Sequence, residues 1–168
     1  MIKNVIPLGR AAVVAALLAT AYQSVAAVEK GPLPAFTVTT LDGTPIDSTL
    51  MTPETQYVLL YVRPDCRPCD RLLALLRSAD SPQFTSRIVV IVNGAPGAGA
   101  AYVARHLPAA AGRVTWYADT QGDGYRALRL TGMPELIGVK NGEMMWSIAG
   151  VLNDASTVES VVRPWETY

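Results

Sequence analysis

Two cysteines three positions apart are the residues best suited to chemistry in this chain of 168 residues. Cys66 and Cys69 lie in the segment YVRPDCRPCDRLLALL, separated by Arg67 and Pro68, and the chain contains no other cysteine. A thiolate is both a nucleophile and a metal ligand. The pair is therefore a redox dithiol, half of a metal site, or a structural disulfide.

The rest of the sequence favours the redox dithiol. A closed structural zinc site needs four ligands, whereas the chain offers two cysteines and one histidine, His106, so we expect no metal. A structural disulfide across so few residues removes little entropy from the unfolded chain. We therefore expect a redox-active disulfide between Cys66 and Cys69. We expect no other cofactor, because the chain has neither a GxGxxG nucleotide motif nor a CxxCH haem motif.

The cysteines lie where a strand is expected to lead into a helix. Residues 57–62 (YVLLYV) are continuously apolar, which is typical of a strand covered on both faces. From Cys66 to Arg77, leucines recur at helical spacing. Free N–H groups and the positive end of the helix dipole at this junction favour the thiolate. Pro68 suits the first turn, where its missing N–H costs little.

Charged residues of both signs flank the cysteines. Arg63, Arg67 and Arg71 add positive charge near the thiols, whereas Asp65 and Asp70 oppose it. Together they raise or lower the pKa of the thiols, depending on which side chains face the sulfur atoms. We expect three of these charged neighbours, Arg63, Asp65 and Arg67, to modulate the site together with Pro68.

The first 27 residues have the pattern of a secretory signal peptide. Lys3 and Arg10 precede an apolar stretch and a small-residue cleavage site. The apolar stretch is about 12 residues, whereas a spanning helix needs roughly 20, so an uncleaved membrane anchor is the less favoured alternative. We expect a periplasmic or otherwise exported protein with one domain, residues 28–168. Removing residues 1–27 leaves 12 basic and 14 acidic residues, a balance that suggests no nucleic-acid partner.

Strand and helix patterns alternate along the mature chain. The dipeptide Asn141-Gly142 is a strong signal for a two-residue hairpin. The alternation predicts an α/β fold: a central mixed β-sheet with helices on both faces and a C-terminal β-hairpin and helix. The expected strands are 57–62, 87–92, 114–119, 135–139 and 143–150; the expected helices are 66–77, 100–112, 124–130 and 153–162; residues 93–101 are expected to be a loop.

Two segments resemble the thioredoxin-like family. Residues 57–76 resemble its active-site strand, CxxC and first helix, and residues 131–150 (TGMPELIGVKNGEMMWSIAG) resemble the proline, hairpin and glycine of its second half. The resemblance implies that the bond between Met133 and Pro134 is cis, and that both residues line a substrate groove opposite the disulfide.

One branch of that family fits best. The signal peptide, the lead segment GPLPAFTVTTLDGTPID and the added strand and helix at 114–130 are similar to TlpA-like periplasmic thioredoxins. This implies an exported thiol–disulfide oxidoreductase that reduces disulfides of protein substrates. By the same resemblance, its electron donor would be a membrane thiol-transfer protein.

Three residues depart from the family pattern. Leu60 stands six residues before the first cysteine, where members often carry a buried acid, and Asp65 stands where an aromatic residue is usual. Glu135 follows Pro134 in place of a small or hydroxylated residue; we expect it to be a solvated strand-end residue, with a proton acceptor near the sulfurs as the alternative. These departures keep two other functions open, a disulfide-forming oxidase and a thioredoxin-like binding or assembly subunit with little turnover.

Overall fold

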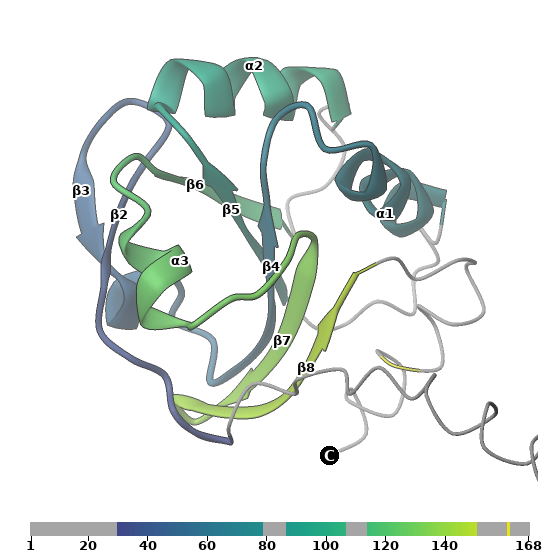
Figure 1. The fold of residues 1–168 in the computed structure, drawn as a ribbon. Helices are drawn as coiled ribbons and strands as arrows, with labels where there is room; N and C mark the ends of the chain where they lie inside the picture. Colours follow the sequence, from purple (N-terminus) through teal and green to yellow (C-terminus); the bar gives the residue numbers. More distant parts are fainter. Residues whose placement is uncertain (1–29, 79–86, 107–113, 151–160, 162–168) are drawn as a thin grey trace, which may run out of the picture.

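A mixed β-sheet forms the centre of the structure (Figure 1). The structure is a computed structural model that describes residues 30–78, 87–106, 114–150 and 161. Within these residues the sheet has eight strands in the order β1-β8-β7-β4-β5-β6-β2-β3. The strands are β1 (Gly31–Pro32), β2 (Thr37–Thr39), β3 (Pro45–Asp47), β4 (Gln56–Val62), β5 (Arg87–Asn93), β6 (Val114–Asp119), β7 (Glu135–Lys140) and β8 (Glu143–Ala149). The helices are α1 (Arg67–Ser78), α2 (Pro96–His106) and α3 (Asp123–Ala127), with a 3-10 turn at Ser48–Leu50.

The parallel strands β4, β5 and β6 lie in the middle of the sheet. Helices α1 and α2 follow β4 and β5 in the chain, as parallel neighbours need crossover connections. Strand β7 pairs antiparallel with β4 and forms a hairpin with β8. The prediction of an α/β fold with a mixed sheet is confirmed. The last predicted helix (153–162) and the signal peptide (1–27) lie outside the described residues, apart from Val161.

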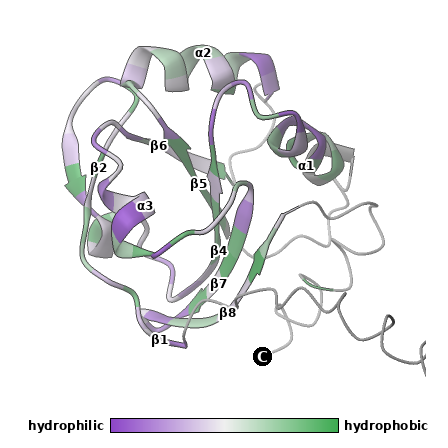
Figure 2. Ribbon diagram, viewed as in Figure 1, coloured by the Kyte–Doolittle hydropathy of each residue, from purple (hydrophilic) through white to green (hydrophobic). Residues whose placement is uncertain are grey.

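Two apolar cores cover the two faces of the sheet. One holds Leu60 and Leu136 of neighbouring strands together with Leu72 of α1 and Tyr102 of α2. The other holds the alternate strand residues, such as Tyr61 and Ile137, with residues that follow α3. Helices α1 and α2 therefore lie on one face and α3 on the other (Figure 1). Strand β7 is largely hydrophobic and α3 largely hydrophilic (Figure 2), as a buried strand and a surface helix require.

The predicted loop at 93–101 was wrong in its second half, because α2 begins at Pro96. Proline fixes φ near the helical value and lacks only an N–H that the first turn leaves unpaired. Gly99 is buried on the side of α2 that faces the sheet. A Cβ at this position would lie 3.4 Å from the Leu41 side chain and 3.7 Å from that of Ala118.

The predicted hairpin forms around Asn141 and Gly142. Their φ angles are 53° and 76°, the two positive values that a type I′ turn requires. Further along the hairpin, a bulge at Gly138/Val139 shifts the register between β7 and β8. Trp146 of β8 packs against Gly138, where a Cβ would overlap its ring. The hairpin thereby fixes the direction of β7, whose first residue follows Pro134.

Candidate active site

Cys66 and Cys69 form a disulfide at the junction of β4 and α1. The S–S distance is 2.05 Å and the two Cα atoms are 5.2 Å apart. The Cys66 carbonyl accepts a hydrogen bond from the Asp70 N–H at 3.0 Å, which makes Cys66 the N-cap of α1. The Cys69 N–H donates to Sγ of Cys66 at 3.2 Å. This sulfur therefore occupies the place where a helix N-terminus holds an acceptor, which favours negative charge on it after reduction.

The two sulfurs differ in their access to solvent. Cys69 has no exposed surface, whereas Cys66 is 5% exposed. Both pack with Leu60, Leu72 and Leu136 in the apolar core under α1. Cys66 caps α1 and is the more exposed residue of the pair, so it is the candidate nucleophile and Cys69 the candidate resolving cysteine.

Met133 and Pro134 lie opposite the disulfide. Their peptide bond is cis, and the Met133 carbonyl oxygen lies 3.8 Å from Sγ of Cys66, although the two residues are 67 positions apart in sequence. Strand β7 begins directly after Pro134 and pairs with β4 so that Glu135 faces Tyr61 in register. The antiparallel pairing of β7 and β4 thus brings the segment before β7 to the start of α1.

The predicted modulators lie at the junction of β4 and α1. Arg63, Asp65 and Arg67 are exposed, and Pro68 is the second residue of α1. Asp65 has a positive φ of 61°, a conformation that aspartate tolerates better than most residues. Its exposure corresponds to the case in which its carboxylate faces water rather than the sulfur atoms.

Glu135 is buried, so the expectation of a solvated strand-end residue was wrong. Only 1% of its surface is exposed, and its Oε2 has no hydrogen-bond partner among the described residues. Burial raises the pKa of Glu135, and a hydrogen bond with Ser147 lowers it in part. Strand alternation places Glu135 on the face of Tyr61, away from Leu136 and the cysteines. The geometry therefore gives no support to Glu135 as the proton acceptor of the site.

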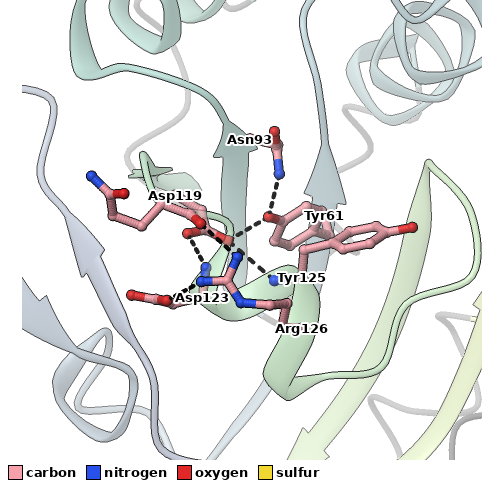
Figure 3. Close-up of polar contacts among 7 residues, drawn as sticks. Tyr61, Asn93, Asp119, Asp123, Tyr125 and Arg126 are labelled. Carbon is pink, nitrogen blue, oxygen red and sulfur yellow. Dashed lines mark hydrogen bonds and ion pairs between the residues drawn. The ribbon is translucent and has the colours of Figure 1, made fainter.

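A buried polar network on the α3 face was not predicted from the sequence (Figure 3). The Tyr61 hydroxyl donates to Oδ2 of Asp119 at 2.5 Å and accepts from Nδ2 of Asn93 at 2.9 Å. The Asp119 carboxylate also accepts the backbone N–H groups of Asp123 (2.8 Å) and Tyr125 (3.1 Å). Burial and the Asp119 carboxylate raise the pKa of Tyr61. The network ties α3, and the segment that leads from it to Met133, to the ends of three strands.

A second missed contact joins α1 to α2. Asp70, directly after Cys69, accepts a hydrogen bond from the Tyr102 hydroxyl at 2.9 Å and lies 3.2 Å from Nε2 of His106. Burial and the Asp70 carboxylate raise the pKa of Tyr102. The Asp70 side chain is thereby directed towards α2 rather than towards the arginines beside it in sequence.

The described residues offer little for other chemistry. Among them, no group of three or more His, Cys, Asp or Glu side chains is arranged to hold a metal ion. In the same part of the chain, no helix combines the length and apolar character needed to cross a membrane.

Comparisons with known proteins give matches at the level of structure. No family model matches the chain, and no curated protein sequence does. A secreted disulfide oxidoreductase of Mycobacterium tuberculosis homologous to E. coli DsbE is 21% identical over 79% of this chain and 96% of its own, with a TM-score of 0.60. A putative thiol:disulfide interchange protein DsbE from Chlorobium tepidum is 19% identical over 82% of this chain and 98% of its own, with a TM-score of 0.65. Copper-bound ScoI of Arabidopsis thaliana is 13% identical over 81% of this chain and 99% of its own, with a TM-score of 0.62.

These neighbours establish the fold as thioredoxin-like, as predicted. Identities at this level show the fold alone, and one fold can serve several functions. The function of this chain therefore has to be argued from its own disulfide and the residues around it.

Proposed function

We propose that the chain is an exported thiol–disulfide oxidoreductase of the TlpA-like type that reduces disulfides in protein substrates. The observation that carries the proposal is the position of the Cys66 sulfur. It caps the N-terminus of α1, belongs to the more exposed of the two cysteines, and lies 3.8 Å from the Met133 carbonyl oxygen. A structural staple needs none of these three properties.

The reaction begins with the reduced dithiol. The Cys66 thiolate attacks one sulfur of a substrate disulfide; the substrate S–S bond breaks, a mixed disulfide forms, and the leaving thiolate takes a proton from solvent. The Cys69 thiolate then attacks Sγ of Cys66, which breaks the mixed disulfide and releases the second substrate thiol. Two electrons pass from the dithiol to the substrate, and the protein is left with the Cys66–Cys69 disulfide seen in the structure.

Met133 and Pro134 form one wall of the proposed substrate groove. The Met133 carbonyl oxygen lies 3.8 Å from the candidate nucleophilic sulfur, which supports this proposal. An extended substrate segment can pair with the backbone of Met133, as in other cases of strand addition. Such pairing would hold the substrate disulfide in line with Cys66 without a demand on side-chain identity, which suits a set of different protein substrates.

The direction of electron flow separates reductase from oxidase. A reductase must be returned to the dithiol after each cycle, and we propose a membrane thiol-transfer protein as its electron donor. The pattern of residues 1–27 supports export, and a secreted neighbour with the same fold is consistent with it. Sequencing the N-terminus of the exported protein tests this part, with mature chains expected to begin near residue 28.

The equilibrium with glutathione tests the direction. The fraction of reduced protein is measured over a series of glutathione redox buffers, together with the rate at which the dithiol reduces insulin. The fraction gives the reduction potential of the Cys66–Cys69 couple. A reductase has a potential close to that of thioredoxin, about −270 mV, whereas a strong oxidase has a potential near −120 mV. A value at the oxidising end would overturn the reductase proposal. If Cys66→Ser left a cellular phenotype and partner binding unchanged, the binding subunit would be the better account.

A further inference from the structure

Three arginines lie close in sequence to the disulfide, in the loop before α1 and on its exposed face. Arg63 lies in the loop between β4 and α1, Arg67 is the first residue of α1, and Arg71 follows one turn later. All three are exposed. Residues four positions apart lie on the same side of a helix, so Arg67 and Arg71 project together. We call Arg63, Arg67 and Arg71 the arginine rim.

The position of the arginine rim is unfavourable for folding. The N-terminus of a helix carries partial positive charge and prefers anions, whereas α1 begins with Arg67. Two like charges four positions apart on a helix repel each other, as Arg67 and Arg71 do. The whole chain has a formal net charge of +0, so this concentration of positive charge is a local feature and not a consequence of composition.

No carboxylate of the described residues forms an ion pair with the arginine rim. The Asp70 carboxylate is engaged by Tyr102 and His106 of α2. Asp65 is exposed, and within the described part of the chain none of the three arginines forms an ion pair with it or with another acid. The described contacts of an acid with arginine or histidine are His106–Asp70 and Arg126–Asp123, and neither involves one of the three arginines.

We propose that the arginine rim selects protein substrates whose disulfide is flanked by acidic residues. The inference rests on the proposed function and specifies its substrate class. Guanidinium groups bind carboxylates through paired hydrogen bonds, and the exposed Arg67 directly follows Cys66 in the chain. Charge complementarity also raises association rates more than it raises final affinity. The rim therefore acts mainly on the rate of encounter.

Three synthetic peptides test the proposal. Each carries the same disulfide and differs only in four flanking residues, which are Glu, Gln or Lys. The second-order rate constant of the reduced protein is measured with each peptide at 0.05 and 0.5 M NaCl. We expect the Glu peptide to react about tenfold faster than the Lys peptide at low salt. Because salt screens exposed charges, the ratio should fall to about twofold at 0.5 M.

Matched variants show whether the arginines cause the preference. In Arg63→Gln/Arg67→Gln the ratio of Glu to Lys rates should fall at least threefold at low salt. The control is Lys30→Gln/Lys140→Gln, which removes the same charge at the hairpin end of the sheet and should keep the wild-type ratio. A ratio of rates cancels any change in the intrinsic reactivity of the Cys66 thiolate, because that reactivity affects all three peptides equally.

The outcomes separate this inference from the proposed function. Equal rates for all three peptides would overturn the proposal that the arginine rim selects acidic substrates, and would leave the proposed oxidoreductase function standing. Equal loss of preference in the control variant would assign the effect to overall charge and also overturn it. Binding to phosphatidylglycerol vesicles through the same arginines, without a peptide preference, would point to a membrane surface instead. Failure to reduce even the Gln peptide would count against the proposed function itself.

Discussion

Replacing Tyr61 with Phe should destabilise the protein by removing one buried hydroxyl. That hydroxyl donates to the Asp119 carboxylate at 2.5 Å and accepts from the Asn93 amide at 2.9 Å. Tyr61 has no exposed surface, so water cannot replace either bond at the hydroxyl. The Asp119 carboxylate, 1% exposed, would keep only the backbone N–H groups of Asp123 and Tyr125 as partners.

The magnitude follows from the two lost hydrogen bonds. A bond to a charged group contributes about 1.5–3 kcal/mol and a neutral bond about 0.5–1.5 kcal/mol. Tyr61→Phe should therefore lower the free energy of unfolding by about 2–4 kcal/mol. For a domain of this size that corresponds to a fall in Tm of roughly 6–16 °C.

Urea denaturation of wild type, Tyr61→Phe and Tyr57→Phe measures the effect. Tyr57 is the matched control because it lies on the same strand and face, is 5% exposed, and has no hydrogen-bond partner for its hydroxyl among the described residues. Burial alone raises its pKa to about 12. Tyr57→Phe should change stability by less than about 0.5 kcal/mol.

Amide hydrogen exchange adds a local measurement. The N–H groups of Asp123 and Tyr125 should lose protection in Tyr61→Phe more than those in the middle of β4, because their acceptor Asp119 loses its fixed position. Equal losses in the two tyrosine variants would refute the role assigned to the network. So would a Tyr61→Phe variant as stable as wild type.

Three further predictions concern the sheet and α2. Glu135→Gln should abolish a pH dependence of stability. Burial raises the pKa of Glu135 above its ordinary value of 4.5. Wild-type stability should therefore fall as pH rises from that value through the raised pKa, by up to about 1.4 kcal/mol per pH unit. In denaturation experiments at successive pH values, the variant should be the more stable protein above that window. Gly138→Ala should cost about 1–3 kcal/mol in urea denaturation because the added methyl overlaps the Trp146 ring. Gly97→Ala should instead raise the free energy of unfolding by up to about 1 kcal/mol, since it lies in α2 with open space around its Cβ position; a loss of stability there would contradict the helix start at Pro96.

The local parts of the fold were predictable from sequence. The continuous apolar run at 57–62 can only be covered on both faces, and it forms β4 at the centre of the sheet. The Asn141-Gly142 dipeptide specifies its turn through backbone conformation alone. The helix after Cys66 follows from leucine spacing. In each case the residues that determine the structure are neighbours in the chain.

The parts that could not be predicted depend on residues distant in sequence. Gly99 in a Gly-rich segment suggests a loop until Ala118 and Leu41 are known to lie against it. Glu135 is polar and next to a proline, yet the pairing of β7 between β4 and β8 buries it. The bond from Tyr61 to Asp119 spans 58 positions. The strand carries two tyrosines, Tyr57 and Tyr61, and the sequence gives no signal that Tyr61 is the one whose hydroxyl joins the network.

The central claim is that Cys66 is the nucleophile and Cys69 the resolving cysteine, and trapping with single-cysteine variants tests it most directly. Cys69→Ala and Cys66→Ala are each incubated at neutral pH with an excess of a disulfide-containing protein, and adducts are quantified by mass spectrometry. The account predicts a stable mixed disulfide through Cys66 in Cys69→Ala, formed at least about tenfold faster than any adduct of Cys69 in Cys66→Ala, because the Cys66 sulfur caps α1 and reaches solvent. Faster trapping through Cys69, or no adduct with either variant, would contradict it.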